Sequence, residues 1–546
     1  MTASLLGNER RHAVTFARID VVSTPFHNPG HRIPSFCTPL GRDDGKPAEA
    51  RAHRSMGLML RRLKGPAGRL DLILLTVAVA LLGARFVALE LSPPGFYVDE
   101  FLGALHAICL SQTGHSSSGQ SWPLFAGGGG GGFYTPVFLY LGAAWTRLFG
   151  PSIYAFRALA ALAGAITVLG ATALARRAGG RRFAFWTFVL ACLSPWGFQF
   201  SRIAWDPPLY PAFVVWAVYV WLGDRRTILK GALSGALFAG ALYSYPPARI
   251  GVPLLFAALL VGGWSRLRWR EVVGFGLSAT ALLAPLAARY RDPEFRGRGA
   301  SLAIFSDGFI RDHRGHWPPW FFVIRSLFDN IAAHFRPSFL FFGGDENIRH
   351  STQYFGELGI LDAFALVMGL ALLAAVVREQ IHPRPHPSPH PRPDDSQCAD
   401  VPGASALASY FGLACLGILC GILPAALTWE AIPHALRSIG AWPFFSLLGG
   451  GLLVLGEARW RAARAGACAV ALVHATLLLF VYFRLYPPLA ESAFSSSLHD
   501  SFARTSALSP ADKASLLSRE SPEGIRYYLI RSRKYDCTTS SEAVSA

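Results

Sequence analysis

The recurrence of long apolar runs along this chain constrains its fold more than any other feature. A helix rises about 1.5 Å per residue and a bilayer core is about 30 Å thick, so roughly 20 apolar residues cross it. Runs long enough to cross recur about eleven times between polar loops. We therefore predict an all-α polytopic membrane protein with about eleven transmembrane helices. The runs lie near residues 71–91, 153–175, 183–200, 207–223, 229–245, 250–264, 272–289, 358–377, 404–428, 436–456 and 465–485.

Composition supports this class of protein. Of the 546 residues, 52% are hydrophobic and 16% are charged, whereas a soluble globular protein has roughly 25% charged residues. The net charge of +17 comes almost entirely from arginine, since the chain has only five lysines. A basic excess in a membrane protein is typical of cytoplasmic loops that face anionic lipids. We therefore predict membrane lipids, and no nucleic acid, as partners.

A further run, 133–149, decides the topology. If it crossed the membrane, the four arginines of "RRAGGRR" (176–182) would face outward, against the positive-inside rule. We therefore predict that 133–149 is a juxtamembrane helix, which its Pro136 and aromatic residues favour. The N-terminus is then cytoplasmic and the C-terminus external. The basic segments that face inward contain Arg61, Arg62, Lys64 and Arg69; Arg176, Arg177, Arg181 and Arg182; Arg225, Arg226 and Lys230; Arg266, Arg268 and Arg270; and Arg459, Arg461 and Arg464.

The chain divides into three regions around this membrane domain. Residues 1–69 are basic and lack the apolar core of a signal peptide, so we predict a disordered cytoplasmic arm, within which Met56 is an alternative start. Residues 70–485 form the membrane domain, with external loops at 92–152 and 290–357 and a cytoplasmic His/Pro-rich linker at 378–403. Residues 486–546 are an external tail. The cysteines show no paired spacing, and Cys192, Cys415, Cys420 and Cys468 lie in apolar runs, which predicts buried thiols.

Polar residues accumulate on the predicted outer face. Asp99 and Glu100 follow the first run, and cations come from the ends of several distant runs. A single arginine at a span end commonly reaches for lipid headgroups. Several together, opposite carboxylates, favour a substrate with a phosphate group, because arginine binds phosphate oxygens bidentately. The residues in question are Arg157, Arg202, Arg249, Arg349, His350, His434 and Arg437.

The adjacent carboxylates of Asp99 and Glu100 predict unequal roles. Neighbouring residues on a helix point about 100° apart, so the two cannot face each other across a substrate as glycosidase pairs do. Only one carboxylate can aim at a reacting group.

Several blocks of the sequence resemble one family of enzymes. The outward "DE", the tract "ALHAICLSQTGHSSSGQSWPLF" and the blocks "SIYAFRALAALAGAITV", "LSPWGFQFSRIAWD", "YSYPPARIGVPLL" and "IPHALRS" resemble the GT-C integral membrane glycosyltransferases. Within these, they are most similar to bacterial relatives of the dolichyl-phosphate-mannose–protein mannosyltransferases and of lipid A aminoarabinose transferases. The resemblance covers roughly residues 70 to 450.

This resemblance implies a GT-C fold with juxtamembrane helices in the first external loop. It also implies inverting transfer of one sugar from a polyprenyl phosphate to a protein, lipid or glycan at the outer face of a bacterial inner membrane. Asp99 would be the general base, and Glu100 would hold the acceptor or neighbouring backbone. The departing lipid phosphate would meet cations or histidines. We expect these substrate-binding residues to be Arg202, Arg249 and Arg437, and behind them Arg157, Arg349, His350 and His434.

Cofactor motifs are missing from the sequence. The glycine run Gly127–Gly132 lacks the context of a phosphate-binding loop and predicts either a mobile loop or a surface spacer. The lack of a nucleotide-binding motif favours a lipid-linked donor, and the first external loop has no DxD motif. We therefore predict no metal and no other cofactor. A transporter or lipid flippase is the alternative, but such proteins bind at the membrane midplane between repeated halves, and no half-repeat is evident. A scaffold without activity is the third alternative.

Overall fold

The computed structural model describes residues 66–128, 132–224, 227–262, 269–381, 404–495, 527–528 and 537. The predictions for most of the N-terminal arm, the His/Pro linker and the external tail lie outside these residues. Most of these residues are helical, and the only sheet among them has two short strands. The predicted all-α architecture is confirmed.

The helices follow the apolar runs closely. Six helices are long and apolar enough to cross a membrane, and four shorter apolar helices accompany them among the described residues. Because the longest helix is bent in its middle, it covers two of the predicted runs, which gives eleven apolar segments in all. They are α2 (Pro66–Ala84), α5 (Ile153–Leu193, both runs), α7 (Leu209–Trp221), α8 (Ile228–Ser244), α9 (Ala248–Gly262), α10 (Trp269–Arg289), α14 (Ile360–Ile381), α15 (Ala404–Ala426), α16 (Trp442–Arg459) and α17 (Arg461–Phe480).

The bend in α5 lies within "RRAGGRR". Gly179 and Gly180 leave the helical conformation, and Gly180 has a φ of 75°, which a residue without a Cβ adopts readily. Two apolar segments therefore follow each other with only these glycines and the flanking arginines between them. This geometry fits a tight basic turn between two spans, as the topology requires.

The first run is shorter as a helix than predicted. We expected a span over 71–91, but α2 ends at Ala84 and irregular turns follow to Gly95. Ala88 has a φ of 51°, a left-handed conformation that a right-handed helix cannot contain, and the buried guanidinium of Arg202 binds the carbonyl oxygens of Ala84 and Val87 in the turns that follow α2. A second prediction also fails, because Cys415 on α15 is exposed rather than buried.

The run at 133–149 forms a separate helix, α4 (Pro136–Phe149), which begins with Pro136 in its first turn. It packs against α3 (Val98–Thr113), a helix of the first external loop that ends at Gly114 with a φ of 73°. Between them, β1 (Ala126–Gly127) pairs antiparallel with β2 (Phe133–Tyr134). The N–H of Gly128 donates to the carbonyl of Gly132 over 2.7 Å, and residues 129–131 of the glycine run lie outside the described residues.

The long loop 290–357 is largely helical. It contains α11 (Pro293–Leu302), α12 (Asp307–His313), α13 (Pro319–Ala333) and the short helix η3 (Ser338–Phe342). Further short helices are α6 (Pro195–Phe200), η5 (Ile439–Ala441), η6 (Val481–Leu485), α18 (Tyr486–Ala490) and η7 (Ser492–Phe494).

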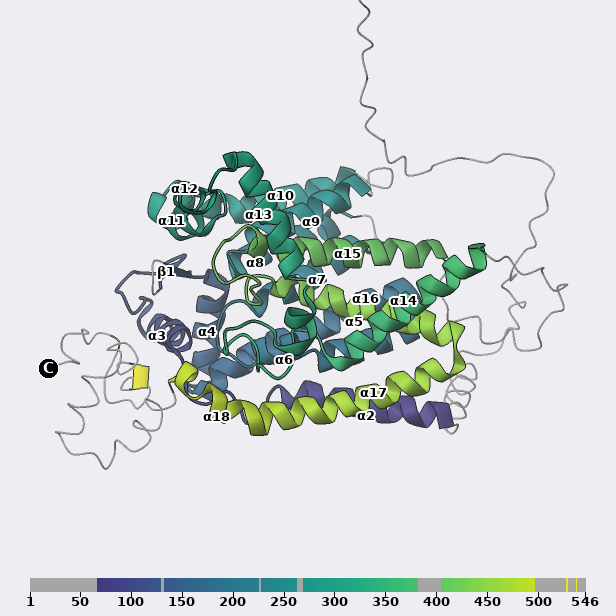
Figure 1. Ribbon diagram of the computed structural model, residues 1–546. Coiled ribbons are helices and arrows are strands. Elements are labelled where there is room, and N and C mark those ends of the chain that lie inside the picture. The colour runs from purple at the N-terminus through teal and green to yellow at the C-terminus, as the bar shows by residue number, and fades with distance from the viewer. Residues whose placement is uncertain are drawn as a thin grey trace, which may run out of the picture. The chain divides into compact units, whose positions relative to one another are not determined.

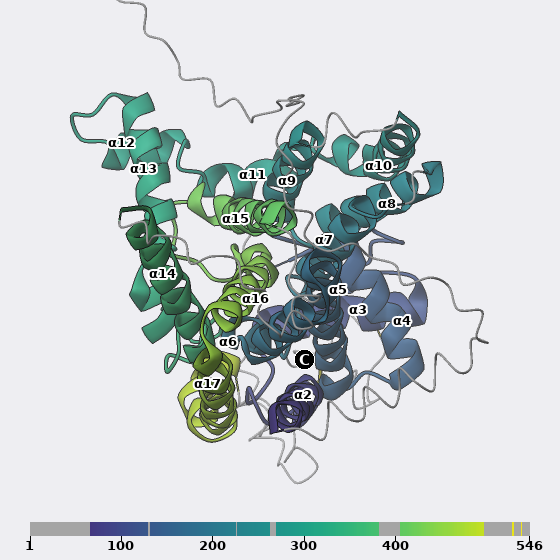
Figure 2. The same cartoon turned by 90° about the vertical axis from the view of Figure 1, so that its right-hand side faces the viewer.

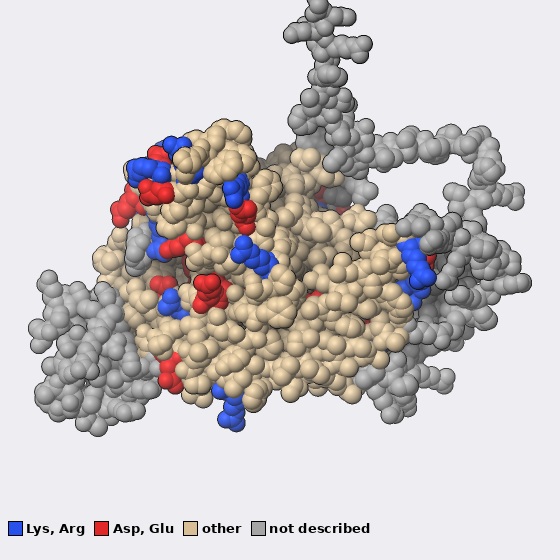
Figure 3. All heavy atoms as spheres, in the orientation of Figure 1, with Lys and Arg blue, Asp and Glu red and all other residues tan. Residues whose placement is uncertain are grey.

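The long helices α15, α16 and α17 run in roughly one direction in Figure 1 and are strongly foreshortened in Figure 2, whereas α14 is inclined to them. The helices α3, α11 and α12 gather at one end of this bundle (Figure 1). On the face drawn in Figure 3, most charged side chains also lie toward that end, and a smaller group lies at the opposite end. The surface between them is mainly uncharged, as expected for a membrane-embedded belt.

Candidate active site

Asp99 lies in the first turn of α3 with its side chain exposed. The hydroxyl of Tyr97 donates a hydrogen bond to its carboxylate. The hydroxyl of Tyr134, on β2, donates to the Asp99 backbone carbonyl over 3.0 Å. Burial and the nearby Asp99 raise the pKa of both tyrosines, so both stay protonated donors. An exposed carboxylate on a rigid backbone can accept a proton from a bound substrate.

Glu100 has a different environment from its neighbour. It is fully buried and forms an ion pair of 2.8 Å with Arg157 of α5, which is equally buried. Its other contacts are the backbone N–H groups of Tyr97 (3.2 Å) and Ala204 (2.7 Å). Arg157 also donates to three carbonyl groups of the turns after α2, those of Leu89, Pro93 and Gly95. In this structure the pair fixes the start of α3 rather than facing a substrate.

Arg202 is likewise buried inside the protein. All three of its guanidinium nitrogens donate to backbone carbonyls between Ala84 and Ser92, at distances from 2.6 to 3.2 Å. Arg202 and Arg157 therefore hold the segment that carries Asp99 from two sides. We leave these two arginines and Glu100 out of the candidate substrate contacts and regard them as positioning residues.

Asp206 joins the site although the sequence analysis did not select it. It is partly buried in the turn before α7, and withdrawal from water raises its pKa to about 7. The charge of Asp99 adds to this increase, and the charge of Arg249 opposes it. The three side chains thus share one electrostatic environment. A carboxylate directly after "SRIAW", four residues from Arg202, was the available signal.

The charges of Arg249 and Arg437 act on titratable groups of this site, Asp206 and Tyr245 respectively. The Arg249 guanidinium lies between aromatic rings, 5.5 Å from the centre of Phe125 and 5.2 Å from that of Phe295. Arg437 is paired with Glu430 at 2.7 Å. The pKa of Tyr245 links these groups, because burial raises it, the charge of Asp206 adds to the increase, and Arg437 opposes it.

Arg349 contacts Tyr97, the residue that binds the Asp99 carboxylate. Its guanidinium lies 4.9 Å from the centre of the Tyr97 ring, whose hydroxyl is bound to Asp99. The side chain is partly exposed, and no carboxylate of the described residues forms an ion pair with it. It is therefore a cation with donors available for a ligand.

His350 and His434 meet at Asp345 rather than at Asp99. The Nδ1 atom of His350 lies 2.9 Å from Asp345 Oδ2, and that of His434 lies 3.6 Å away. Burial first, and then the charge of Arg437, lower the pKa of His434. Burial opposes ionisation of Asp345, but the hydrogen bond and charge of His350 outweigh it and lower the pKa of Asp345. His350 also packs on Trp205 (5.9 Å between ring centres), which in turn contacts Tyr97.

An apolar cavity of about 290 Å³ lies beside this site. Its walls come from α4, α8, α10 and the first external loop. Tyr243, one of the lining residues, packs on Phe125 beneath Arg249 (6.2 Å between ring centres). The other lining residues are Leu124, Pro136, Val137, Ala236, Ala239, Gly240 and Leu282.

One further feature, missed from the sequence, is a disulfide between Cys109 of α3 and Cys537 of the tail. Nearby, Tyr527 packs on Phe96 with ring centres 5.1 Å apart. The two cysteines are 428 positions apart in the sequence, and no spacing rule indicates such a pair.

Comparison with known proteins connects this site with one family. Residues 134–288 match the family described as dolichyl-phosphate-mannose-protein mannosyltransferase. The matched segment includes Tyr134, Asp206 and Arg249. The resemblance of the chain to the GT-C membrane glycosyltransferases is therefore confirmed. No curated protein matches the chain.

Two solved structures are similar over most of the chain. One is ArnT from Cupriavidus metallidurans bound to undecaprenyl phosphate, with 12% identity, 85% of each chain covered and a TM-score of 0.48. The other is the oligosaccharyltransferase AglB from Archaeoglobus fulgidus in complex with an inhibitory peptide and a dolichol-phosphate. It has 13% identity, covers 84% of this chain and 59% of that chain, and has a TM-score of 0.39. Both scores are low, so no residue assignment below rests on them.

Proposed function

We propose that this protein transfers a single sugar from a polyprenyl-phosphate donor to an acceptor at the outer face of the membrane. The observation that carries the proposal is the exposed carboxylate of Asp99, which Tyr97 and Tyr134 hold by hydrogen bonds. Arg349 lies over the Tyr97 ring, and the charges of Asp99 and Arg249 both act on Asp206. The family match over residues 134–288 supports the reaction class.

In the proposed reaction Asp99 accepts the proton of an acceptor hydroxyl as that oxygen attacks the anomeric carbon. The bond between this carbon and the donor phosphate oxygen breaks from the opposite side, so the configuration inverts. The electron pair leaves with the polyprenyl phosphate, which gains one negative charge. Arg249 and Arg349 are the cations placed to stabilise that charge, and Arg437 is a third if its pairing with Glu430 opens.

Asp206 complements Asp99 in this scheme. A group with a pKa of about 7 is protonated in a large fraction of molecules near neutral pH. It then adds little negative charge beside a departing phosphate and can donate a hydrogen bond to it.

The apolar cavity suits the lipid part of the donor. It is lined almost only by carbon atoms of α4, α8 and α10, and its Tyr243 is one aromatic ring away from Arg249. A polyprenyl chain in this cavity would place its phosphate near Arg249. We propose this cavity for the first isoprene units.

The disulfide supports the proposed orientation. Disulfides persist in oxidising compartments such as the bacterial periplasm, and Cys109 lies on the same helix as Asp99. Together with the basic loops assigned to the cytoplasm, this favours an active site on the outer face of a bacterial inner membrane.

The proposal is tested with the purified protein in lipid nanodiscs and a set of synthetic polyprenyl-phosphate sugars. With an acceptor extract from the cell envelope, we expect release of free polyprenyl phosphate from at least one donor, with the sugar recovered in the acceptor fraction. If sugar and lipid phosphate stay joined for every donor while a lipid crosses the bilayer, the protein is a flippase.

A further inference from the structure

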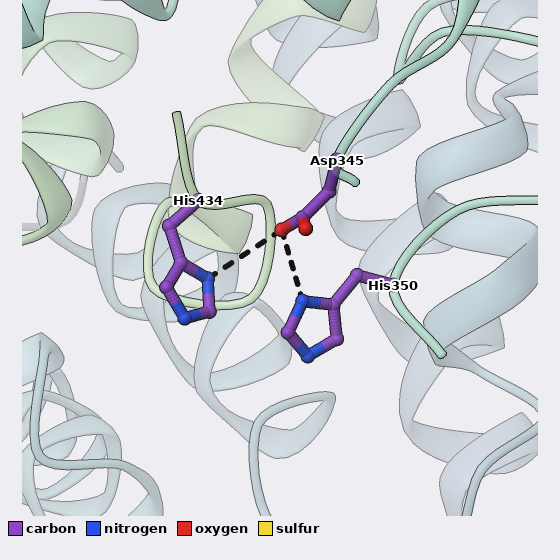
Figure 4. A group of neighbouring side chains, drawn as sticks. All are labelled: Asp345, His350 and His434. Atoms are coloured by element: carbon purple, nitrogen blue, oxygen red, sulfur yellow. Dashed lines mark hydrogen bonds and ion pairs between the residues drawn. The ribbon is translucent and has the colours of Figure 1, made fainter. Parts of the chain in front are cut away.

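Three metal-binding side chains meet at one point of the outer segments. Asp345 and His350 belong to the turn after η3, and His434 belongs to the turn before η5, about 90 residues further on. One donor atom from each lies within 4.8 Å of the other two. Figure 4 shows both imidazole rings turned toward the same carboxylate. All three side chains are buried, with exposed fractions between 3% and 7%.

Within the described part of the chain, the Nδ1 atom of His434 lacks the hydrogen-bond partner that a buried polar atom normally has. The Oδ2 atom of Asp345 lies 3.6 Å away, which is too far for a hydrogen bond. A buried polar atom without a partner destabilises the folded protein. A cation between the imidazole and the carboxylate would satisfy it.

The spacing of the donor atoms fits a small divalent cation. Zinc binds imidazole nitrogen and carboxylate oxygen at about 2.0–2.2 Å in tetrahedral geometry, which places neighbouring donors roughly 3.3 Å apart. Here the two imidazole nitrogens lie 2.9 and 3.6 Å from the carboxylate oxygen. Two imidazoles and a carboxylate are a ligand set that zinc uses with a fourth position open.

Surrounding groups hold these ligands in place, as the outer shell of a metal site does. Asp345 Oδ1 accepts from the Asn347 N–H, and Oδ2 accepts from the Ala435 N–H, both over 2.8 Å. The backbone N–H of His434 donates to Nε2 of His334 over 3.1 Å. The positive charge of Arg437 acts against a further positive charge at His434, and Arg437 is itself paired with Glu430 at 2.7 Å.

We propose that Asp345, His350 and His434 bind one divalent transition-metal ion of the zinc class, which joins the turn after η3 to the turn before η5. The predicted absence of a metal was based on the first external loop, whereas this site uses two other segments. Its position has a consequence for the proposed reaction. His350 follows Arg349 in the chain and packs on Trp205, which contacts Tyr97. The ion therefore positions Arg349 over Tyr97 and takes no part in bond making.

Without a metal, the same residues would form a hydrogen-bonded clamp between His350 and Asp345. The clamp needs only that pair and leaves His434 dispensable. The metal site needs all three side chains. His434 therefore separates the two alternatives.

The test uses the full chain, purified without a polyhistidine tag, stripped with a chelator and reloaded with ZnCl2. Because His382, His386 and His390 of the linker also offer imidazoles, all samples carry glutamine at these three positions. We expect about one zinc per chain by mass spectrometry of the metal content. We also expect X-ray absorption to report two imidazoles and oxygen ligands.

The His434→Gln variant should bind zinc at least tenfold more weakly, whereas His434→Cys, which keeps a ligand, should retain it. The control is His316→Gln, an exposed histidine of the same external region, which should leave binding unchanged. If the reloaded protein holds no stoichiometric zinc, or if His434→Gln binds as tightly as the control, the proposal is overturned. The zinc content of the protein with the unsubstituted site tests the proposal even if a variant fails to fold. None of these readings depends on sugar transfer, so the result is independent of the proposed function.

Discussion

Glu100 and Arg157 form a fully buried ion pair of 2.8 Å directly beside the exposed carboxylate of Asp99. Two adjacent acidic residues in one helical turn thus have opposite environments. The buried one fixes the start of α3 and the exposed one faces outward. This division explains why the pair occurs at the end of a membrane span, and it makes separate predictions for the two side chains.

Arg157→Met should destabilise the protein by about 3–5 kcal/mol, because it leaves the charge of Glu100 buried without a partner. Replacing both residues, by Glu100→Gln and Arg157→Met, should recover a large part of that loss. The measurement is the unfolding midpoint in detergent. Arg325→Met provides the control, since its exposed pair with Asp329 should contribute less than about 1 kcal/mol. Equal losses for the two arginines would contradict the positioning role.

Tyr97→Phe removes the hydroxyl that donates to the Asp99 carboxylate. Hydrogen bonds to charged groups contribute about 1.5–3 kcal/mol. If the oriented carboxylate is needed in the transition state, loss of this amount lowers kcat by about 10- to 100-fold. Tyr140→Phe is the matched control, because its hydroxyl binds the Pro123 carbonyl of the same loop, away from Asp99. Steady-state rates of sugar transfer check this, and identical rates for both variants would separate Tyr97 from the reaction.

Much of this architecture can be predicted from the sequence. The apolar runs and the positive-inside rule locate the helices, because a helix that crosses a bilayer must be long and apolar and few other segments have both properties. The turns that follow α2 could not be predicted, because Arg202, more than 110 residues away, binds the carbonyls of Ala84 and Val87 there. The same limit applies to the site. Asp99 is evident from its position, whereas the pairing of His350 with His434 depends on how two separate turns meet.

Asp206 should give the protein a pH dependence near neutrality. Its pKa is raised to about 7 in the folded state, so the folded protein binds more protons than the unfolded chain between about pH 4 and pH 7. Stability should therefore fall as pH rises through this range. Asp206→Asn should flatten that slope and remove an inflection near pH 7 from the rate of sugar transfer. Unfolding midpoints and rates measured from pH 4.5 to 8.5 test this; an unchanged slope in the variant would exclude Asp206 as the source.

The disulfide predicts a difference in thiol labelling. Cys109 and Cys537 should react with a maleimide reagent only after reduction, whereas Cys109→Ser should release one reactive thiol in the tail without reduction. Labelling of intact spheroplasts with a membrane-impermeant reductant and maleimide shows on which side the pair lies. We expect labelling from outside, and labelling only after the membrane is opened would reverse the assigned orientation.

The most direct test of the account is the transfer rate of Asp99→Asn in nanodiscs, with the donor and acceptor found for the unsubstituted protein. The substitution keeps the shape of the side chain but removes the base, which contributes at least about 100-fold to such reactions. Asp312→Asn, an exposed carboxylate on α12, is the control and should retain full activity. We predict that Asp99→Asn folds normally, binds the donor and transfers sugar at least 100 times more slowly. Transfer at the rate of the Asp312→Asn control would contradict the assignment of Asp99 as the base.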